Sequence, residues 1–404
     1  LGDCYLCCTL AALAEKPRWV QSIFAHPQFG LAHADIYDRK GGRHVTETGK
    51  HQARERRTAT GALQVDEMSL GGFRVNINVS GWWQSVVVDE FLPAVMEPIF
   101  AKDRTQLREI WASIAEKAYA KVHGSYAALI GGSDAQALRD FTGFPTTSIM
   151  SYFADDASRA ALFDKLVDWD RRDFCITLLC PVESKLPAMC PAKTAKEVAD
   201  MGLACGHAFS LLRAIEVAGE RLVQIRNPWG NATEWKGAWS DTDPRWKSTP
   251  VVAKACTFSP APDDGTFWMS WADAVRFFTD GTVCHTLKGW FDYRVRCPLV
   301  PTPRADGASL ALAVYVESPL QLVLTLSQAT ASRTPAAFRT TNGAGTLPLV
   351  ALQLCLAEPV RRFKATAAGG RRLSSATAAG AAPGAAYSAS SDADVAEYRV
   401  VQCS

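Results

Sequence analysis

The sequence predicts an α+β protein with two lobes, followed by an antiparallel β-sandwich. Apolar residues repeat at helical spacing in residues 2–15 and 107–123. Further along, apolar runs bounded by turn residues indicate several strands between residues 175 and 225. Beyond a proline-rich linker, alternate positions are leucine, as in a half-buried strand: Leu320, Leu322, Leu324 and Leu326. We therefore expect a first lobe in residues 1–142, a second in 143–297 and a sandwich in 304–404.

Composition places the chain among globular proteins and argues against two function classes. Its 404 residues can form two or three cores, since single domains usually have roughly 100–200 residues. The 43 Lys and Arg nearly balance the 41 Asp and Glu, which argues against a nucleic-acid-binding protein. No apolar run approaches the roughly 20 residues that cross a bilayer, and the start at Leu1 shows no signal-peptide pattern. We expect a cytoplasmic piece of a longer protein.

The cysteines indicate reduced thiols rather than a disulfide framework. Their positions show no repeated spacing, and a chain of this length does not need disulfides to be stable. A zinc site would need a second Cys-x-x-Cys pair, which the sequence lacks. The cysteines are Cys4, Cys7, Cys8, Cys175, Cys180, Cys190, Cys205, Cys256, Cys284, Cys297, Cys355 and Cys403.

The first lobe is predicted to contain helices and one hairpin. Residues 2–15 form a helix that Asp3 can begin and Pro17 interrupts. The polar stretch at about 32–70 indicates a surface insertion, with solvated arginines. Alternating apolar residues in 73–89, broken by glycine, predict a β-hairpin. The helix at 107–123 follows, and glycines at 131, 132 and 143 mark the border with the second lobe.

The second lobe and the tail are predicted to be rich in strands. Strands are expected at 175–180, 208–217 and 221–225, the last two joined by a tight turn. In the tail, residues at about 365–393 are mostly Ala, Gly and Ser, which indicates a flexible loop. A final strand is expected at 395–401. The tail is interpreted as a brace, although a calcium- or lipid-binding module is an alternative.

Cys4 is the candidate nucleophile. It stands in the first turn of an apolar helix, where unpaired backbone N–H groups and the helix dipole favour a thiolate. The thiolate is the reactive form of cysteine. A cysteine before an apolar helix is also a common core residue, so its position alone does not decide between the two.

His207 and Asn227 are the candidate partners of Cys4. His207 begins one predicted strand and Asn227 ends the next, so antiparallel pairing brings both to one end of the hairpin. A simple count leaves the pair about three residues out of register, which requires a bulge or a wider turn. Asn227 would orient the imidazole, and Trp229 would shield their hydrogen bond from water. A histidine after glycine is more often structural; the order Cys, His, Asn favours catalysis.

Six blocks, in the same order, resemble the signatures of calpain-family cysteine proteases, whose core is papain-like. They cover roughly residues 1–296, interrupted by the insertion at 32–70. The blocks are LGDC at 1–4, EKAYAKVHGSYAALIGG at 116–132, GHAFS at 206–210, IRNPWG at 225–230, EWKGAWSD at 234–241 and DDGTFWMSW at 263–271. LQLVLTLSQ at 320–328 resembles, over a shorter stretch, the β-sandwich that follows the protease core in that family.

The resemblance implies a two-lobed protease with substrate peptide between the lobes. One lobe would hold Cys4, and the other His207 and Asn227. In many family members calcium bound to each lobe closes the cleft. Glu234, Asp241 and Asp264 match acidic calcium ligands of the second lobe, and hard carboxylate oxygens suit that ion. Ordinary surface acids are the alternative interpretation of these three residues.

Three positions depart from the family pattern. Thr266 stands where a further acidic ligand is usual, and Ala127 replaces an acidic ligand of the first lobe. Tyr5 stands where the family usually has Trp. The glutamine that completes the oxyanion hole in the family would precede Leu1, which leaves the Cys4 N–H as one donor. Loss of one such donor costs on the order of 100–1,000-fold in rate.

The expected function is an intracellular cysteine endopeptidase that acts on protein substrates through a Cys4–His207–Asn227 triad and an acyl-enzyme. The chemistry requires no cofactor, and calcium is expected only as a regulator. The resemblance leaves membrane or cytoskeletal association open. The first alternative is a weak or inactive calpain-like scaffold that binds partners. The second is a transglutaminase-like acyl transferase, which would normally have Asp in place of Asn227.

Overall fold

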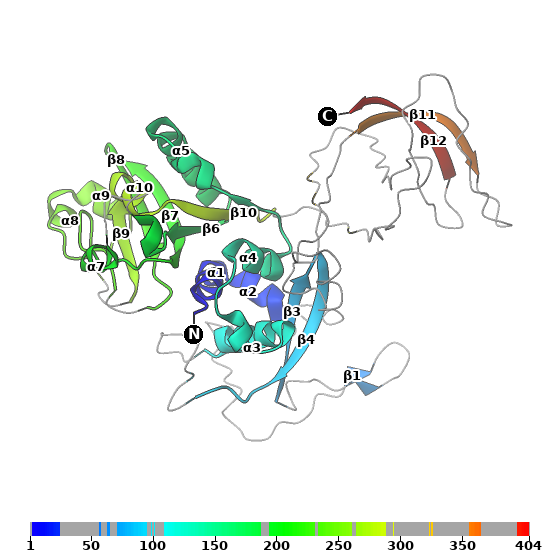
Figure 1. The fold of residues 1–404 in the computed structure, drawn as a ribbon, viewed down its shortest axis with the longest axis horizontal. Helices are drawn as coiled ribbons and strands as arrows, with labels where there is room; N and C mark the ends of the chain where they lie inside the picture. The colour runs from blue at the N-terminus through cyan, green and yellow to red at the C-terminus, as the bar shows by residue number, and fades with distance from the viewer. Residues whose placement is uncertain are drawn as a thin grey trace. The chain divides into compact units, whose positions relative to one another are not determined.

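The computed structural model describes residues 2–24, 71–94, 109–186, 194–230, 233–260 and 264–287, and also 56–57, 63–64, 98, 101, 294, 323, 325, 355–364 and 394–403. The chain divides into two compact units (Figure 1). The first contains residues 1–290 and 332–334, and the second contains residues 291–331 and 335–404. No helix within the described ranges has the length and apolarity needed to span a bilayer.

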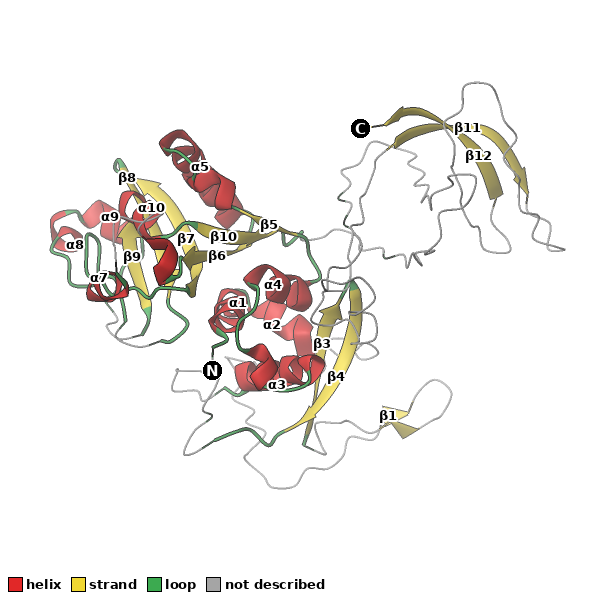
Figure 2. Cartoon of the chain, viewed as in Figure 1, coloured by secondary structure: helices red, strands yellow, loops and turns green. Residues whose placement is uncertain are grey.

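Helices and one hairpin make up the beginning of the first unit (Figure 2). The helices are α1 (Cys4–Ala14), α2 (Pro17–Phe24), α3 (Trp111–His123) and α4 (Asp134–Thr142). A short 3-10 helix, η3 (Ala127–Leu129), follows α3. Their apolar side chains share one core, in which Leu6, Ile77 and Ala115 are fully buried. The predicted helix at 2–15 is confirmed, and the helix predicted at 107–123 is confirmed from Trp111 onward.

The hairpin consists of β3 (Gly72–Val79) and β4 (Trp82–Asp89), paired antiparallel with Val79 opposite Trp82. Ser80 and Gly81 have φ of 53° and 92°, which places the two-residue turn in the primed class that matches strand twist. The predicted hairpin is confirmed, and Phe73, Val75 and Ile77 of β3 are buried at alternate positions. The second strand is mostly exposed, with Val88 buried.

Among the described residues of the first unit, a six-stranded antiparallel sheet and further helices follow α4. Its order is β5-β10-β6-β7-β8-β9. The strands are β5 (Thr146–Ser148), β6 (Cys175–Cys180), β7 (His207–Val217), β8 (Glu220–Arg226), β9 (Thr266–Ser270) and β10 (Asp280–Cys284). The helical elements are α5 (Asp156–Arg171), α7 (Ala195–Asp200), α8 (Arg245–Ser248), α9 (Pro250–Ala255), α10 (Trp271–Phe277), η4 (Met150–Phe153) and η5 (Glu183–Lys185). The strands predicted at 175–180, 208–217 and 221–225 are confirmed.

The β7–β8 hairpin has both features expected for it. Its turn is tight, with Ala218 and Gly219 at φ of 51° and 81°. The register shifts between Leu211 and Arg213, which is a β-bulge. The last pair is Ser210 opposite Arg226, so the chain leaves the sheet immediately before Asn227. The bulge reduces only part of the predicted register offset between His207 and Asn227. The rest of the offset is taken up because the chain leaves β8 before Asn227.

The second unit contributes one described antiparallel pair, β11 (Cys355–Lys364) and β12 (Asp394–Cys403). The strand predicted at 395–401 lies within β12 and is confirmed. The predicted β-sandwich is not confirmed. Of the strand predicted at 320–328, the structure describes only Val323 and Thr325, which are exposed and lie in no strand. The predicted loop at 365–393 lies outside the described residues.

The predicted insertion at 32–70 also lies largely outside the described residues. Within it the structure describes a pair of two-residue strands, β1 (Arg56–Arg57) and β2 (Leu63–Gln64).

The helices and sheets described above confirm the coarse part of the predicted fold class, a mixture of helix and sheet. The lobe boundaries at 142 and 297 stay predictions.

Candidate active site

Cys4 is the first residue of α1, and its thiol is half-buried. The preceding residue, Asp3, accepts backbone hydrogen bonds from Leu6 and Cys7 through its carbonyl oxygen, at 2.8 and 3.1 Å, which fixes the first turn. Burial, followed by the charge of Asp3, raises the pKa of Cys7 well above its ordinary value. Burial does the same for Cys8. The thiols of Cys7 and Cys8, which follow Cys4 in the same helix, are therefore held neutral.

Two glycines fix the segment that leads into Cys4. The Gly131 N–H donates to the Gly2 carbonyl at 2.8 Å. A Cβ on Gly132 would lie 2.3 Å from the ring carbon Cζ of Tyr5, so the ring packs directly against the glycine backbone. Tyr5 is buried behind Cys4. The Gly-Gly pair at 131–132 therefore has a packing role at the start of α1.

His207 is the first residue of β7 and is 4% exposed. Its Nε2 lies 2.9 Å from Oδ1 of Asn227, which is fully buried. The surrounding contacts fix the orientation of the amide, since Asn227 Nδ2 donates to the Thr233 carbonyl at 3.0 Å and Oδ1 accepts from the Trp229 N–H at 3.1 Å. An amide oxygen is only an acceptor, so Nε2 carries the imidazole proton. Nδ1 is then the basic nitrogen.

Aromatic rings cover the His207–Asn227 pair. The Trp229 ring lies 4.3 Å from the imidazole, centroid to centroid, and the Phe209 ring meets it edge-on at 4.8 Å. Trp229 itself is 48% exposed, so it separates the pair from solvent. Burial lowers the pKa of His207 below its ordinary value, opposed by the hydrogen bond with Asn227. A neutral imidazole near pH 7 can accept a proton.

A hydrogen bond joins the helix of Cys4 to the strand of His207. The Ser210 hydroxyl, on β7, donates to the Cys8 carbonyl on α1 at 2.7 Å, and both residues are buried. Among the described residues no hydrogen bond links the Cys4 thiol to His207 itself. The structure thus brings His207, Asn227 and Trp229 into direct contact, and it places Cys4 on a helix bonded to the same strand.

Cys284 and His285 are neighbours in sequence, but their surroundings do not suit catalysis. Cys284 is fully buried; burial raises the pKa of its thiol, which contacts the Thr142 hydroxyl at 3.3 Å. The His285 Nε2 lies 3.1 Å from the Thr147 hydroxyl, and its ring packs edge-on against Phe174 at 5.1 Å. A buried neutral thiol is a poor nucleophile.

Two of the three acids predicted as calcium ligands, Glu234 and Asp264, contact the loop beside Asn227. Glu234 Oε1 accepts the Gly265 N–H, and Asp264 Oδ1 accepts the Thr266 N–H, both at 2.6 Å. The Gly265 carbonyl in turn accepts the Asn227 N–H at 2.7 Å. The structure does not gather Glu234 and Asp264 into a site with Asp241. Within the described ranges no three His, Cys, Asp or Glu residues group as a metal site. Each of these contacts uses one oxygen of its carboxylate, so the calcium-ligand role of the three acids stays a prediction.

Sequence reasoning missed two residues that support the site. Ser210 lies inside the GHAFS block, but nothing in the sequence shows that its hydroxyl reaches α1. Gly265 has φ of +85°, and a Cβ there would lie 2.7 Å from the Asn227 carbonyl oxygen. The Asp-Gly dipeptide at 264–265 is a turn signal that could have identified the second residue.

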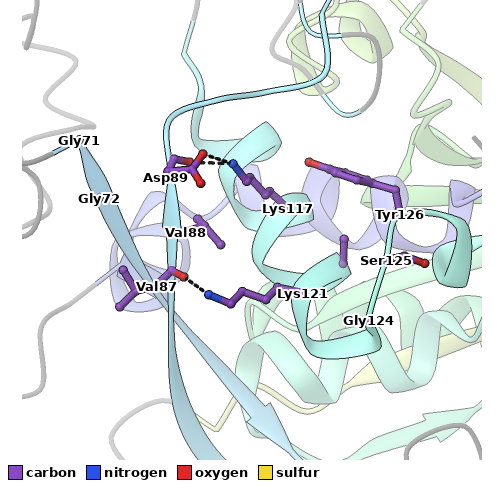
Figure 3. A pocket seen from close by; sticks show the side chains of 11 residues that line it. Gly71, Gly72, Val87, Val88, Asp89, Lys117, Lys121, Gly124, Ser125 and Tyr126 are labelled. Carbon is purple, nitrogen blue, oxygen red and sulfur yellow. Dashed lines mark hydrogen bonds and ion pairs between the residues drawn. The ribbon is translucent and has the colours of Figure 1, made fainter.

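A separate pocket of about 440 Å³ lies between the β3–β4 hairpin and the end of α3 (Figure 3). Its two lysines already contact protein groups. Lys117 Nζ donates to the Phe91 carbonyl at 2.6 Å and pairs with Asp89, and Lys121 Nζ donates to the Val87 carbonyl at 2.7 Å. These contacts tie both lysines to the edge of β4.

A buried histidine hydrogen-bonded to an asparagine, on a strand bonded to a helix that begins with cysteine, is an arrangement typical of cysteine hydrolases. Comparison gives the family. The profile described as "Calpain family cysteine protease" matches residues 1–285. The chain therefore belongs to the calpain family of cysteine proteases.

Individual relatives agree with this assignment. "Calpain-type cysteine protease DEK1" of Arabidopsis thaliana is 37% identical over 230 residues, which is 56% of this chain and 10% of that protein. "Calpain clp-4" of Caenorhabditis elegans is 36% identical over 217 residues, 52% of this chain and 29% of the relative. "Calpain-9" of Homo sapiens is 28% identical over 295 residues, which is 70% of this chain and 35% of that protein. The chain thus aligns with about a tenth to a third of the length of these relatives.

Proposed function

We propose that the chain is the catalytic part of a calpain-type cysteine endopeptidase acting on protein substrates. Cys4 is the nucleophile, His207 the general base and Asn227 the residue that orients the imidazole. The observation that carries the proposal is the buried contact of 2.9 Å between His207 Nε2 and Asn227 Oδ1, which leaves Nδ1 as the basic nitrogen. Family membership supports the same reaction class.

The reaction begins when His207 Nδ1 takes the proton of the Cys4 thiol. The thiolate attacks the peptide carbonyl carbon, and the Cys4 N–H stabilises the oxyanion. The imidazolium then gives its proton to the leaving amine, which produces a thioester. Water, deprotonated by His207, hydrolyses the thioester and regenerates the thiol. No step of this reaction passes through calcium.

Cleavage of a casein substrate, and of quenched fluorescent peptides, tests the proposal. We expect cleavage by the wild-type chain and none above background in Cys4→Ala or His207→Ala. Cys256→Ala is the matched control, because Cys256 is a buried thiol on another part of the sheet lobe. A folded wild-type chain that cleaves nothing would favour the alternative function, a calpain-like scaffold that binds protein partners. Cleavage that persists in Cys4→Ala would refute the assigned nucleophile.

A further inference from the structure

Two carboxyl groups are buried beside the start of α1, and the proposed mechanism uses neither. Asp3, which immediately precedes Cys4, is 5% exposed, and Glu116 on α3 is 1% exposed. Burying an unpaired carboxylate is costly, so such groups normally pair with a base or keep a proton. Within the described residues neither group forms an ion pair with Lys or Arg.

The contacts of Glu116 connect three parts of the first lobe. Its Oε2 accepts the Ala101 N–H at 3.0 Å, and the Ala101 carbonyl accepts the Ser113 hydroxyl of α3 at 2.6 Å. Besides burial, which is the largest cause, a side-chain hydrogen-bond contact with Asp3 and the charge of Asp3 raise the pKa of Glu116. Asp3 holds the first turn of α1 through its carbonyl oxygen, as described above. Glu116 therefore links α3, residue 101 and the segment that carries Cys4.

One oxygen of each acid has no hydrogen-bond donor, which indicates how the two side chains interact. Asp3 Oδ2 and Glu116 Oε1 are both buried without a donor. Two ionised carboxylates cannot hydrogen-bond each other, because both are acceptors only. One proton between them supplies the missing donor and halves the buried charge. Aspartic dyads share a proton for the same reason, since like charges in contact cannot both ionise.

Neighbouring titratable groups are consistent with a proton on this pair. Burial, followed by the hydrogen bond with Asp3, raises the pKa of Glu116 to about 9. Burial, followed by the charge of Glu116, raises the pKa of Tyr126 to about 12. Cys7, whose Sγ lies 3.9 Å from Asp3 Oδ1, is also held neutral. Tyr126 and Cys7, which lie next to the pair, are thus held in their neutral forms.

We propose that Asp3 and Glu116 form a carboxylic acid–carboxylate pair that shares one proton and holds the segment carrying Cys4. Glu116 is then a positioning residue, and its effect on catalysis rests on the proposed function of Cys4. The pair fixes the backbone on which the Cys4 thiol and N–H stand. Displacement of a reacting group by about 1 Å can cost on the order of 100-fold in rate.

The first experiment measures the shared proton without using activity. A group whose pKa is raised by folding gives stability that is complete below its unfolded pKa and is lost as pH rises through the folded pKa. For Glu116 the window runs from about 4.5 to about 9. The ratio of the unfolding equilibrium constants of wild type and Glu116→Gln should therefore rise about tenfold per pH unit across this window. Glu197→Gln, at an exposed site on α7, sets the baseline. A Glu116→Gln ratio as flat as that baseline would overturn the pair.

The second experiment tests the positioning role. Alkylation of Cys4 by iodoacetamide is followed across pH 6–10 in wild type, Glu116→Gln and Glu116→Ala. The Gln side chain keeps an acceptor for the Ala101 N–H and a donor for Asp3. We therefore expect Glu116→Gln to be alkylated at Cys4 at a rate within about threefold of wild type, and its plot of rate against pH to show no break near pH 9. Ala should lower the rate by on the order of 10–100-fold. Equal rates in Ala and wild type would overturn positioning. A wild-type Cys4 that never reacts would instead refute the proposed function, while the stability ratio still decides the pair.

Discussion

Asn227 is the most constrained residue of the candidate site. Its side chain contacts His207, the Trp229 N–H and the Thr233 carbonyl, while its backbone N–H bonds the Gly265 carbonyl. Both ends of the amide therefore have fixed partners, and the amide cannot flip without placing two like groups together. This explains why Asn is suited to orienting an imidazole here.

Replacing Asn227 by Ala should lower kcat/KM on the order of 100-fold, with most of the loss in kcat, because the imidazole loses its preferred tautomer and orientation. Steady-state peptide cleavage measures this. Asn78→Ala is the control, since Asn78 is a buried asparagine that bonds the Gly81 N–H in a distant hairpin. A loss of equal size in the control would mean that general destabilisation, not imidazole orientation, is measured.

His207 should make the fold sensitive to mild acid. Burial lowers its pKa below 6.5, so its contribution to stability is present above that value and is lost as pH falls through the folded pKa. We expect the melting temperature of wild type to drop more steeply below pH 6.5 than that of His207→Gln. His285, whose pKa is also lowered by burial, stays in both proteins and cancels in the comparison. Parallel curves would contradict the burial of His207.

The candidate catalytic residues could be identified in the sequence more readily than the residues that support them. Cys4, His207 and Asn227 stand in short blocks whose order and residue types identify them. The side-chain interactions of the acidic residues near Cys4 could not be predicted in this way. Asp3 is predicted to begin the helix, and it is the residue before α1, but its side chain caps no backbone N–H. In the proposed pair this side chain instead shares a proton with Glu116, 113 residues away, an interaction that no local pattern shows.

At the scale of elements, the contact of α1 with β7 positions the site. The Ser210–Cys8 hydrogen bond joins the beginning of β7 to the middle of α1. Ser210→Ala should destabilise the chain by about 1 kcal/mol, the usual net value of one hydrogen bond, and should slow Cys4 alkylation. Denaturant unfolding and alkylation rates measure the two effects. Ser22→Ala removes an exposed serine bond to the Trp19 carbonyl and should change neither. An unchanged alkylation rate in Ser210→Ala would show that the bond does not position Cys4.

Strands were easier to predict than the helices α4 and α5, for physical reasons. Cys175–Cys180 is buried at nearly every position, so its continuous apolar run is clear in the sequence. The glycines of 131–143 predict only a border, whereas the structure has α4 there, capped by Ser133. The sequence analysis also did not predict α5, which buries only Leu162, Phe163 and Leu166 along 16 residues. One narrow buried stripe gives little periodicity to detect.

At the scale of the whole molecule, the calcium role implied by resemblance is the expectation that the contacts support least. Glu234 and Asp264 bond backbone N–H groups of the loop behind Asn227. We therefore expect calcium to raise the melting temperature no more than magnesium does, and Glu234→Gln to lower it equally with either ion. Differential scanning fluorimetry measures both. A calcium-specific increase that disappears in Glu234→Gln would restore the predicted ligand role.

The central claim is that Cys4 and His207 act as one thiol–imidazole pair. Labelling by an epoxide thiol-protease probe, with the adduct located by mass spectrometry, tests it most directly. Cys7 and Cys8 serve as internal controls, because burial holds both thiols neutral on the same peptide. We predict an adduct on Cys4 alone, lost in both Cys4→Ala and His207→Ala. An adduct on Cys7 or Cys8, undiminished labelling in His207→Ala, or a folded wild-type chain without label would contradict the claim.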